Sequence, residues 1–306
     1  MGIKLLNCFI KKNCNESLYK KNLYELSGKK IVVDASIYIY KFLENNLLIE
    51  NMYIVCSIFR YYNIIPLFVF DGKPPSEKKI TINERRVQKK KAIEKYNLLS
   101  FEYEKNKQQK TMKKMKKLKK YIVTVKKDNI KQLKLLLDYC GIQWIQADGE
   151  ADGLCANLVK NNIAYACLSE DTDLFLHGCP RVLRYLSIIN HTVILYDLHK
   201  ILHKLNLSFN DFKKICILSG TDYNKSEKNI FTYYNLFKLF CLSKEKDFHK
   251  WLIYKNLLET NVDLLNKISN IYFNSVQINT INNISFNEIQ KNNLKTLLHS
   301  KNFIFI

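Results

Sequence analysis

Short continuous apolar runs alternate with longer stretches of helical spacing along most of the chain. Apolar runs of this kind, bounded by polar turn residues, favour buried parallel strands. We expect strands at residues 31–33, 64–70, 142–145, 164–168, 181–186 and 192–196. Helical spacing covers residues 37–48 and 127–140, begins again near residue 149, and dominates the chain after Asp197. This alternation predicts an α/β fold with a mostly parallel central sheet flanked by helices.

Residues 76–120 interrupt the pattern with 17 Lys and Arg residues and only five Asp and Glu residues. The segment predicts long Lys-rich helices with weak apolar faces. The whole chain has a formal net charge of +21, which favours a polyanionic partner and nucleic acid in particular. We therefore expect four parts: an N-terminal part of the core (1–75), a basic helical insertion (76–120), an internal part of the core (121–224) and a helical C-terminal region (225–306).

Composition excludes several classes of protein. The 306 residues are 47% hydrophobic, which supports a real core, yet no apolar run approaches the ~18 residues of a membrane-spanning helix. Nine Cys residues without a Cys-x-x-Cys pair indicate reduced thiols in an intracellular protein. His199 and His203 stand at helical spacing, but no third ligand accompanies them. A half-exposed helix face explains them better than a zinc site.

Acidic residues stand where the apolar strands end. Asp34, Asp71, Asp171 and Asp173 follow such runs, while Glu150 and Asp152 begin a helix. Each acid alone could cap a turn or complement a helix dipole. Together they would meet at one sheet edge, where Mg²⁺ or Mn²⁺ tolerates clustered carboxylates. Two such ions ~3.5–4 Å apart can hydrolyse a phosphodiester. The positions therefore predict a divalent metal site.

Several stretches follow one another in an order that chance does not readily explain. They are Met1-Gly2-Ile3, residues 33–43, 69–75, 147–160 and 169–173, and the sequence Leu-Ser-Gly-Thr-Asp-Tyr at 218–223. In order and spacing they resemble the flap endonuclease group of structure-specific 5′ nucleases, the XPG-like nucleases. The resemblance covers residues 1–75 and 122–224 in detail. It implies a PIN-like nuclease core that cleaves DNA near single-strand/duplex junctions, in replication, repair or recombination.

The resemblance also implies a set of metal ligands. Two Mg²⁺ (or Mn²⁺) ions are expected, the first among Asp34, Asp71, Glu150 and Asp152, the second among Asp171, Asp173 and Asp222. All seven positions are acidic. Asp152 stands where the family usually has Glu and is shorter by one methylene, which would allow its contact to run through a water.

The basic insertion resembles the family's helical arch, which threads the free 5′ strand. A Lys-rich helix pair above a metal cluster would also, on physical grounds, attract single-stranded phosphate. By resemblance, Lys78 and Arg85, or else Arg86, contact the scissile phosphate, and a base stacks on Tyr40. The remaining expected DNA contacts are Gly2, Gly220, Lys225 and Lys228. For residues 113–120, a solvated Lys-rich helix or a nuclear import signal is also a fair interpretation.

Two segments depart from the family. Asn229 and Phe231 stand where the duplex-gripping helix–turn–helix normally has glycines, so duplex binding is expected to be weaker or differently built. The last residues, NNLKTLLHSKNFIFI, contain no recognisable sliding-clamp peptide. The expected partner is DNA with a 5′ flap, nick, gap or junction, bound by a monomer in the nucleus or, for a viral protein, at the viral replication site.

Two alternatives remain open at this point. One is a phosphatase that uses Asp171 as nucleophile and Asp173 as acid. The other is a non-catalytic nucleic-acid binder on the same fold. The first gives five acids no role, and the second does not explain why the acid set is complete.

Overall fold

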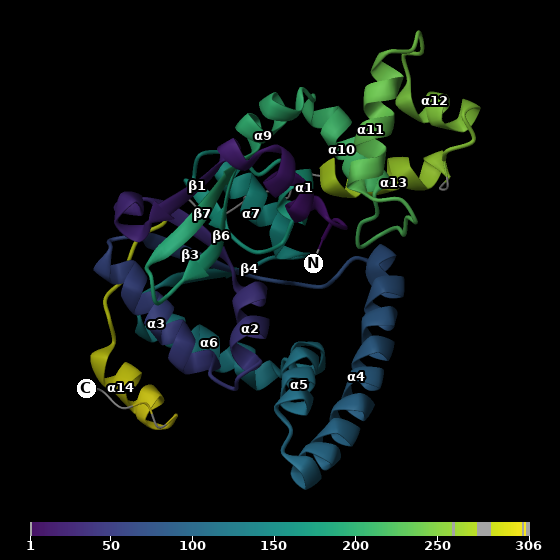
Figure 1. Cartoon of the computed structure of the whole chain (residues 1–306). Coiled ribbons are helices and arrows are strands. Elements are labelled where there is room, and N and C mark those ends of the chain that lie inside the picture. Colours follow the sequence, from purple (N-terminus) through teal and green to yellow (C-terminus); the bar gives the residue numbers. More distant parts are fainter. Residues whose placement is uncertain (1, 259–260, 274–282, 302, 304–306) are drawn as a thin grey trace.

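Seven strands form one sheet in the order β1-β7-β6-β5-β2-β3-β4 (Figure 1). The computed structural model describes residues 2–258, 261–273, 283–301 and 303. The strands are β1 (Leu18–Asn22), β2 (Lys30–Asp34), β3 (Ile65–Phe70), β4 (Gln143–Gln146), β5 (Ala166–Leu168), β6 (Arg181–Ser187) and β7 (Thr192–Asp197). Strands β6, β5, β2, β3 and β4 run parallel, and β7 is antiparallel to both β6 and β1. The predicted mostly parallel sheet is confirmed.

Helices cover both faces of the sheet because successive strand residues point to opposite sides. In β2, Ile31 and Val33 face one cluster of buried apolar side chains, and Val32 faces the other. The first face carries α2 (Ala35–Leu43), α3 (Leu48–Tyr61), α6 (Lys127–Tyr139) and α14 (Lys291–His299). The second carries α1 (Leu6–Asn13), α7 (Ala151–Lys160), α8 (Asp173–Leu176) and α9 (Leu198–Leu205).

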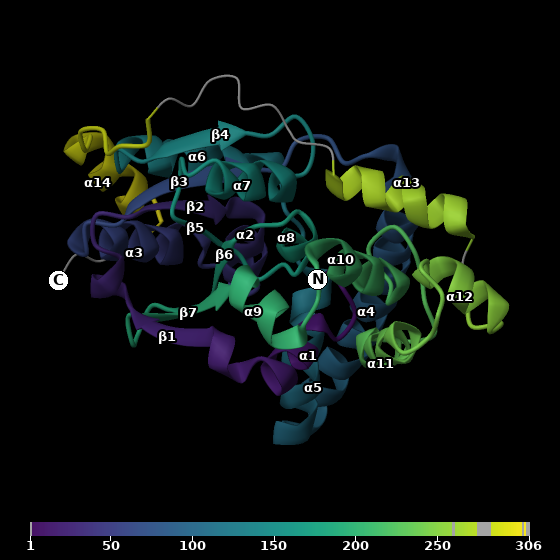
Figure 2. The same cartoon turned by 90° about the horizontal axis from the view of Figure 1, so that it is seen from above.

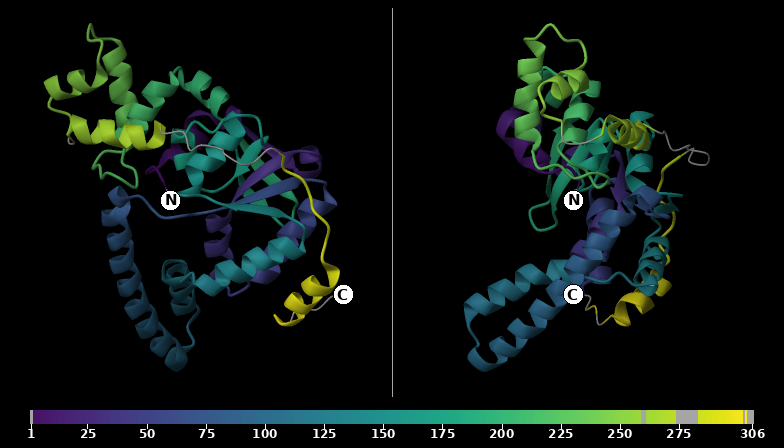
Figure 3. Two further views of the ribbon diagram at one scale, coloured as in Figure 1. Left: turned by 180° about the vertical axis from the view of Figure 1, so that it is seen from behind. Right: turned by 90° about the vertical axis from the view of Figure 1, so that its right-hand side faces the viewer.

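The basic insertion forms a helical arm that projects from the core (Figure 3). Its helices α4 (Lys79–Asn106) and α5 (Gln109–Ile122) pack side by side as a hairpin that turns at Lys107, whose φ is 44°. Only Ala92 and Leu99 of α4 and Thr111 of α5 are buried. Nearly all of the lysines therefore lie in solvent, as the weak apolar faces predict.

The C-terminal region is helical and lies in two places (Figure 2). Helices α10 (Phe209–Leu218), α11 (Ile230–Cys241), α12 (Phe248–Tyr254) and α13 (Val262–Phe273) gather near the base of the arm. Helix α14 packs on α6 at the other end of the molecule. The expectation about a clamp peptide concerns a segment that lies partly outside the described residues, so it stays a prediction.

Most of the expected helices and strands are confirmed, but the prediction of one helix is wrong. The expected helix over residues 37–48 is two helices, because α2 ends at Leu43 and α3 starts at Leu48. Asn46 between them has a φ of 58°, a left-handed conformation that Asn tolerates and a helix does not. Helix α1 and strand β1 were not predicted. All nine Cys residues are unbridged, and no described helix has the length and apolarity to cross a bilayer.

Candidate active site

The carboxyl ends of the parallel strands bring the first two acids together. Asp34 ends β2 and caps α2, accepting a hydrogen bond from the backbone N–H of Ser36 (3.1 Å). Its Oδ2 also accepts from the hydroxyl of Ser169 (2.8 Å). Asp71 follows β3, and its Oδ2 accepts from the hydroxyl of the same Ser36. The two acids therefore share one serine, which fixes both carboxyls at the sheet edge.

A glycine lets the second of these strand ends approach the next helix. The backbone N–H of Gly72 donates to the carbonyl of Gly149, and a Cβ at Gly72 would collide with the carbonyls of Ala147 and Asp148. This contact places Asp71 Oδ1 at the N-terminus of α7, 2.8 Å from the backbone N–H of Ala151. The same helix start carries Glu150 and Asp152. Acids from three segments thus meet here.

The loop after β5 supplies the next pair. The backbone N–H of Asp171 donates to the hydroxyl of Ser169 (3.0 Å), and the N–H of Asp173 donates to Asp171 Oδ1 (3.1 Å). Asp173 begins α8, and both acids are buried. Gly2 lies against them, since a Cβ there would collide with both carboxyls. The expected contact of Gly2 with DNA would therefore occur directly over this pair.

Desolvation and mutual repulsion raise the pKa values of these carboxyls. Desolvation, and next the charge of Asp71, raise the pKa of Asp34 to about 7. Burial, and next the charge of Asp171, raise the pKa of Asp173. Burial also raises the pKa of Asp171. Desolvation and then the charge of Asp171 raise the pKa of Asp152. Since like charges act strongly only at short range, the acids share one site.

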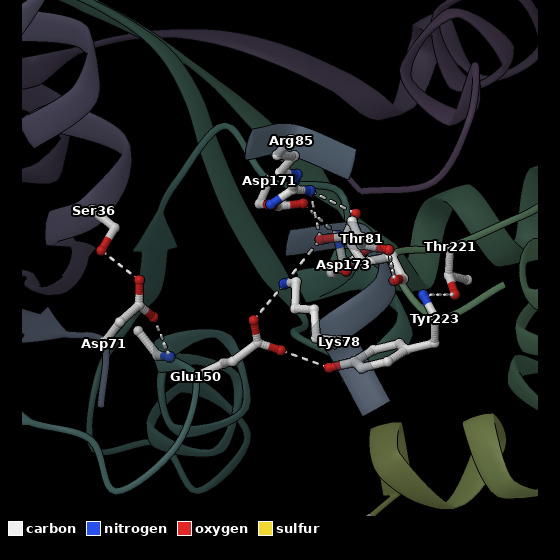
Figure 4. Close-up of polar contacts among 12 residues, drawn as sticks. Ser36, Asp71, Lys78, Thr81, Arg85, Glu150, Asp171, Asp173, Thr221 and Tyr223 are labelled. Carbon is white, nitrogen blue, oxygen red and sulfur yellow. Dashed lines mark hydrogen bonds and ion pairs between the residues drawn. The ribbon is translucent and has the colours of Figure 1, made fainter. Parts of the chain in front are cut away.

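The last acid is paired with the base of the arm. Asp222, in the loop after α10, accepts from Lys78 Nζ (2.8 Å) and from Arg85 Nη2 (2.8 Å). Lys78 also pairs with Glu150, so its ammonium lies between two carboxylates (Figure 4). The hydroxyl of Thr81 donates to the backbone carbonyl of Asp222. The first turn of α4 is thereby fastened to the acid cluster.

The hydrogen bonds and ion pairs of the acids determine which carboxylate oxygens are available to a cation. Within the described residues, no three His, Cys, Asp or Glu side chains already converge closely enough to chelate one ion. Lys78 and the serine hydroxyls occupy carboxylate oxygens that an ion would take. Asp173 Oδ1 is buried and has no hydrogen-bond partner among the described residues.

The other expected DNA contacts differ in their exposure to solvent. Tyr40 of α2 is 49% exposed, and Arg86 is exposed on α4. Lys225 pairs with Glu84 of the arm, and Gly220 is buried with a φ of 96°. Lys228 lies before α11 and is half-buried. The two histidines on α9 are both exposed, as expected.

Three residues near the acids were given no role by sequence reasoning. Ser36 and Ser169 hydrogen-bond to the strand-end acids, and their position beside those acids was the available signal. Tyr272 of α13 donates to Asp173 from 99 residues further along the chain. Nothing in its surroundings in the sequence points to that contact.

Two family models match the chain: the XPG N-terminal domain over residues 1–92 and the XPG I-region over residues 141–222. Flap endonuclease 1 of Methanococcus aeolicus is 32% identical over 233 residues, which cover 69% of this chain and 68% of that protein. Flap endonuclease 1 of Theileria annulata is 33% identical, over 73% of this chain and 46% of that protein. Flap endonuclease 1-A of Oryza sativa is 32% identical, over 75% of this chain and 64% of that protein. The chain thus spans less than two thirds of these two eukaryotic relatives.

Solved structures share the fold over almost the whole chain. The catalytic core of Rad2 in complex with DNA substrate matches with a TM-score of 0.71 at 22% identity, covering 98% of this chain and 95% of that one. Flap endonuclease-1 from Methanococcus jannaschii matches with a TM-score of 0.65 at 24% identity, covering 94% of this chain and 91% of that one. With the two family models and the archaeal relative, the assignment is clear: the chain belongs to the flap endonuclease family of XPG-like nucleases.

Proposed function

We propose that this protein is a metal-dependent, structure-specific 5′ nuclease that hydrolyses DNA phosphodiesters near single-strand/duplex junctions. One observation carries the proposal: seven acids from five segments of the chain surround one edge of the sheet, at the point where a strongly basic helical arm begins. They are Asp34, Asp71, Glu150, Asp152, Asp171, Asp173 and Asp222. Membership of the flap endonuclease family supports the reaction class.

The acids suit two Mg²⁺ (or Mn²⁺) ions. Every donor is a carboxylate, which hard divalent cations prefer, and buried Asp173 Oδ1 lacks any other partner in the described structure. We assign Asp34, Asp71, Glu150 and Asp152 to one ion and Asp171, Asp173 and Asp222 to the other. When bound, such ions activate water and neutralise charge at a phosphodiester under attack.

The chain's own cations would bind and orient the substrate. Lys78 holds its ammonium beside Glu150 and Asp222, within the acid cluster, so a phosphate that reaches the acids also meets a fixed positive charge. Arg85 lies further along the arm and adds a planar guanidinium. The lysines of α5 attract the single strand toward the arm, and exposed Tyr40 offers a ring for a base.

The family assignment separates this proposal from the phosphatase alternative. That alternative needs only the pair of acids after β5 and gives the arm no role. Trapping an aspartyl-phosphate on Asp171 would favour it over the nuclease.

The direct test is a cleavage assay on labelled DNA with a 5′ flap, a nick, a gap or a four-way junction. We expect cleavage in Mg²⁺ that stops in EDTA. Asp171→Ala or Asp173→Ala should abolish cleavage while DNA binding survives or tightens, because removing negative charge lessens repulsion of phosphate. Asp128→Ala, at an exposed position on α6, is the matched control and should cleave normally. Wild-type turnover in either site variant would refute the assignment.

A further inference from the structure

A tyrosine of the C-terminal region reaches into the acid cluster. The hydroxyl of Tyr272, on α13, donates a hydrogen bond to Asp173 Oδ2 over 3.1 Å. The side chain is only 4% exposed. Its ring packs edge-on against His177 at 5.0 Å and against Tyr223 at 5.7 Å between ring centroids. The ring is therefore held from two sides, and its hydroxyl is directed at the carboxyl.

This contact makes the two oxygens of Asp173 unequal. Oδ2 accepts from Tyr272, whereas Oδ1 is buried and has no hydrogen-bond partner among the described residues. A hydrogen bond to one oxygen restricts rotation of the carboxyl and leaves the other oxygen as the available ligand. A second tyrosine contacts the acids in the same manner, since the hydroxyl of Tyr223 donates to Glu150 Oε2 (2.6 Å).

We propose that Tyr272 is a positioning residue that orients Asp173 so that Oδ1 faces a bound divalent ion. The inference rests on the proposed function, because it takes Asp173 as a ligand. It extends that function to α13, which lies beyond the residues that the two family models match. The site would then depend on a helix that carries none of its acids.

The first test measures Mn²⁺ binding to the DNA-free protein, by the electron paramagnetic resonance signal of free Mn²⁺. Tyr272→Phe removes only the hydroxyl and should weaken Mn²⁺ binding about 10-fold, as loss of a ligand's outer partner typically does. Tyr234→Phe is the matched control. Tyr234 is also a buried tyrosine, and its hydroxyl donates over 3.1 Å to the carbonyl of Leu205, away from the acids.

The second test separates positioning from packing. In Tyr272→Phe the Mg²⁺ concentration for half-maximal cleavage should rise about 10-fold, while the rate at saturating Mg²⁺ stays within about 3-fold of wild type. A purely structural role would lower the rate at every Mg²⁺ concentration. Thermal unfolding in EDTA should show a modest loss of stability in both Tyr→Phe variants, since each loses a buried, hydrogen-bonded hydroxyl.

The outcomes separate a failure of the role of Tyr272 from a failure of the proposed nuclease function. If the wild-type protein neither binds Mn²⁺ nor cleaves DNA, the proposed function fails. If the wild type does both and Tyr272→Phe binds Mn²⁺ equally well, only the role of Tyr272 is refuted. Equal weakening of Mn²⁺ binding in Tyr234→Phe, or a loss of rate that saturating Mg²⁺ does not restore, would also refute it.

Discussion

The ammonium of Lys78 lies 2.8 Å from Oδ2 of Asp222, in an ion pair whose side chains are each 11% exposed. Burial lowers the pKa of Lys78, but the carboxylates of Asp222 and Glu150 outweigh burial and raise it overall. Burial likewise raises the pKa of Asp222, yet Lys78 and Arg85 lower it overall. Both partners therefore stay charged at neutral pH, and the arm keeps a permanent cation at the acid cluster.

Lys78→Ala should lower the single-turnover cleavage rate with little change in DNA affinity. A fixed cation that meets the scissile phosphate is expected to contribute about 100-fold, in the range of other preorganised transition-state donors. Lys79→Ala, at the next position and exposed, is the control and should leave the rate unchanged. Equal effects of the two substitutions on rate, or a loss of affinity in Lys78→Ala that accounts for its lower rate, would contradict a catalytic role.

The raised carboxyl pKa values predict how metal-free stability depends on pH. The pKa of Asp34 is about 7 in the folded protein against an ordinary value of 3.8, so the folded state binds more protons between those values. Stability should therefore fall as pH rises from about 4 to about 7, by up to about 1.4 kcal/mol per pH unit for each such group, and then level off. Thermal unfolding in EDTA at pH 5 and pH 8 measures this fall.

The variant Asp34→Asn identifies the source of that pH dependence. It removes one titrating group, so its unfolding temperature should differ less between pH 5 and pH 8 than that of the wild type. Asp128→Asn, at an exposed position, should keep the full wild-type difference. A metal-free protein that is more stable at pH 8 than at pH 5 would contradict the expected direction.

The arm should supply much of the salt-dependent affinity for single-stranded DNA. Lys113, Lys114, Lys116 and Lys117 are all exposed on α5, and replacing all four with Ala should weaken binding. The slope of log K against log salt should become shallower by about 0.7 for each phosphate that the variant no longer neutralises. Cleavage at saturating DNA should continue, because these lysines lie away from the acids.

A charge-matched control tests whether position or total charge matters. Lys244, Lys246, Lys250 and Lys255 are exposed around α12, and replacing them with Ala removes the same charge elsewhere. Single-strand binding by this variant should keep a slope close to that of the wild type. If both sets flatten the slope equally, the arm has no special part in capturing the strand.

Duplex binding should depend on ionic strength but hardly on whether the salt is KCl or NaCl. At the N-terminus of α11 the side chain of Asn229 accepts from the backbone N–H groups of Phe231 (3.0 Å) and Thr232 (3.4 Å). The ring of Phe231 packs on Phe9. This helix end therefore caps itself instead of offering bare backbone to phosphate and a monovalent ion.

The measurement is affinity for a nicked or flapped duplex in KCl and NaCl at matched ionic strength. The sodium and potassium values should agree closely. A several-fold preference for potassium would show that an ion-bridged contact exists despite Asn229 and Phe231. Asn229→Gly, which restores the residue expected in the family, should introduce such a preference if this substitution alone removed it.

The sheet and its acids were predictable because both depend on local signals. Each parallel strand is a continuous apolar run, and parallel strands necessarily end at one edge, so Asp34, Asp71 and Asp171 had to lie near one another. The edge strand β1 was harder to predict, since it has the sequence Leu-Tyr-Lys-Lys-Asn, which is polar and half-exposed. Strand β1 forms by pairing with β7, and its own sequence has no apolar run that would predict a strand.

Contacts between distant segments lay beyond sequence reasoning. The bond from Tyr272 to Asp173 depends on how α13 packs near α10, and an ordinary amphipathic pattern does not encode that orientation. The pair between Lys78 and Asp222 is similar, although both residues stand out in the sequence. Residue types at strand ends predicted which side chains matter, whereas the tertiary packing determines which of them touch.

The acids of the site are spread along the chain from position 34 to position 222. The first of them, Asp34, ends β2, which lies inside the sheet between β5 and β3. On the ribosome, Asp34 and Asp71 emerge long before Asp222, and Tyr272 emerges later still. A nascent chain that ends before Asp222 has most of the acids but neither the last one nor α13. If the proposed assignments hold, such a chain lacks one ligand of the second ion and the tyrosine that orients Asp173, so the metal site is completed only late in synthesis.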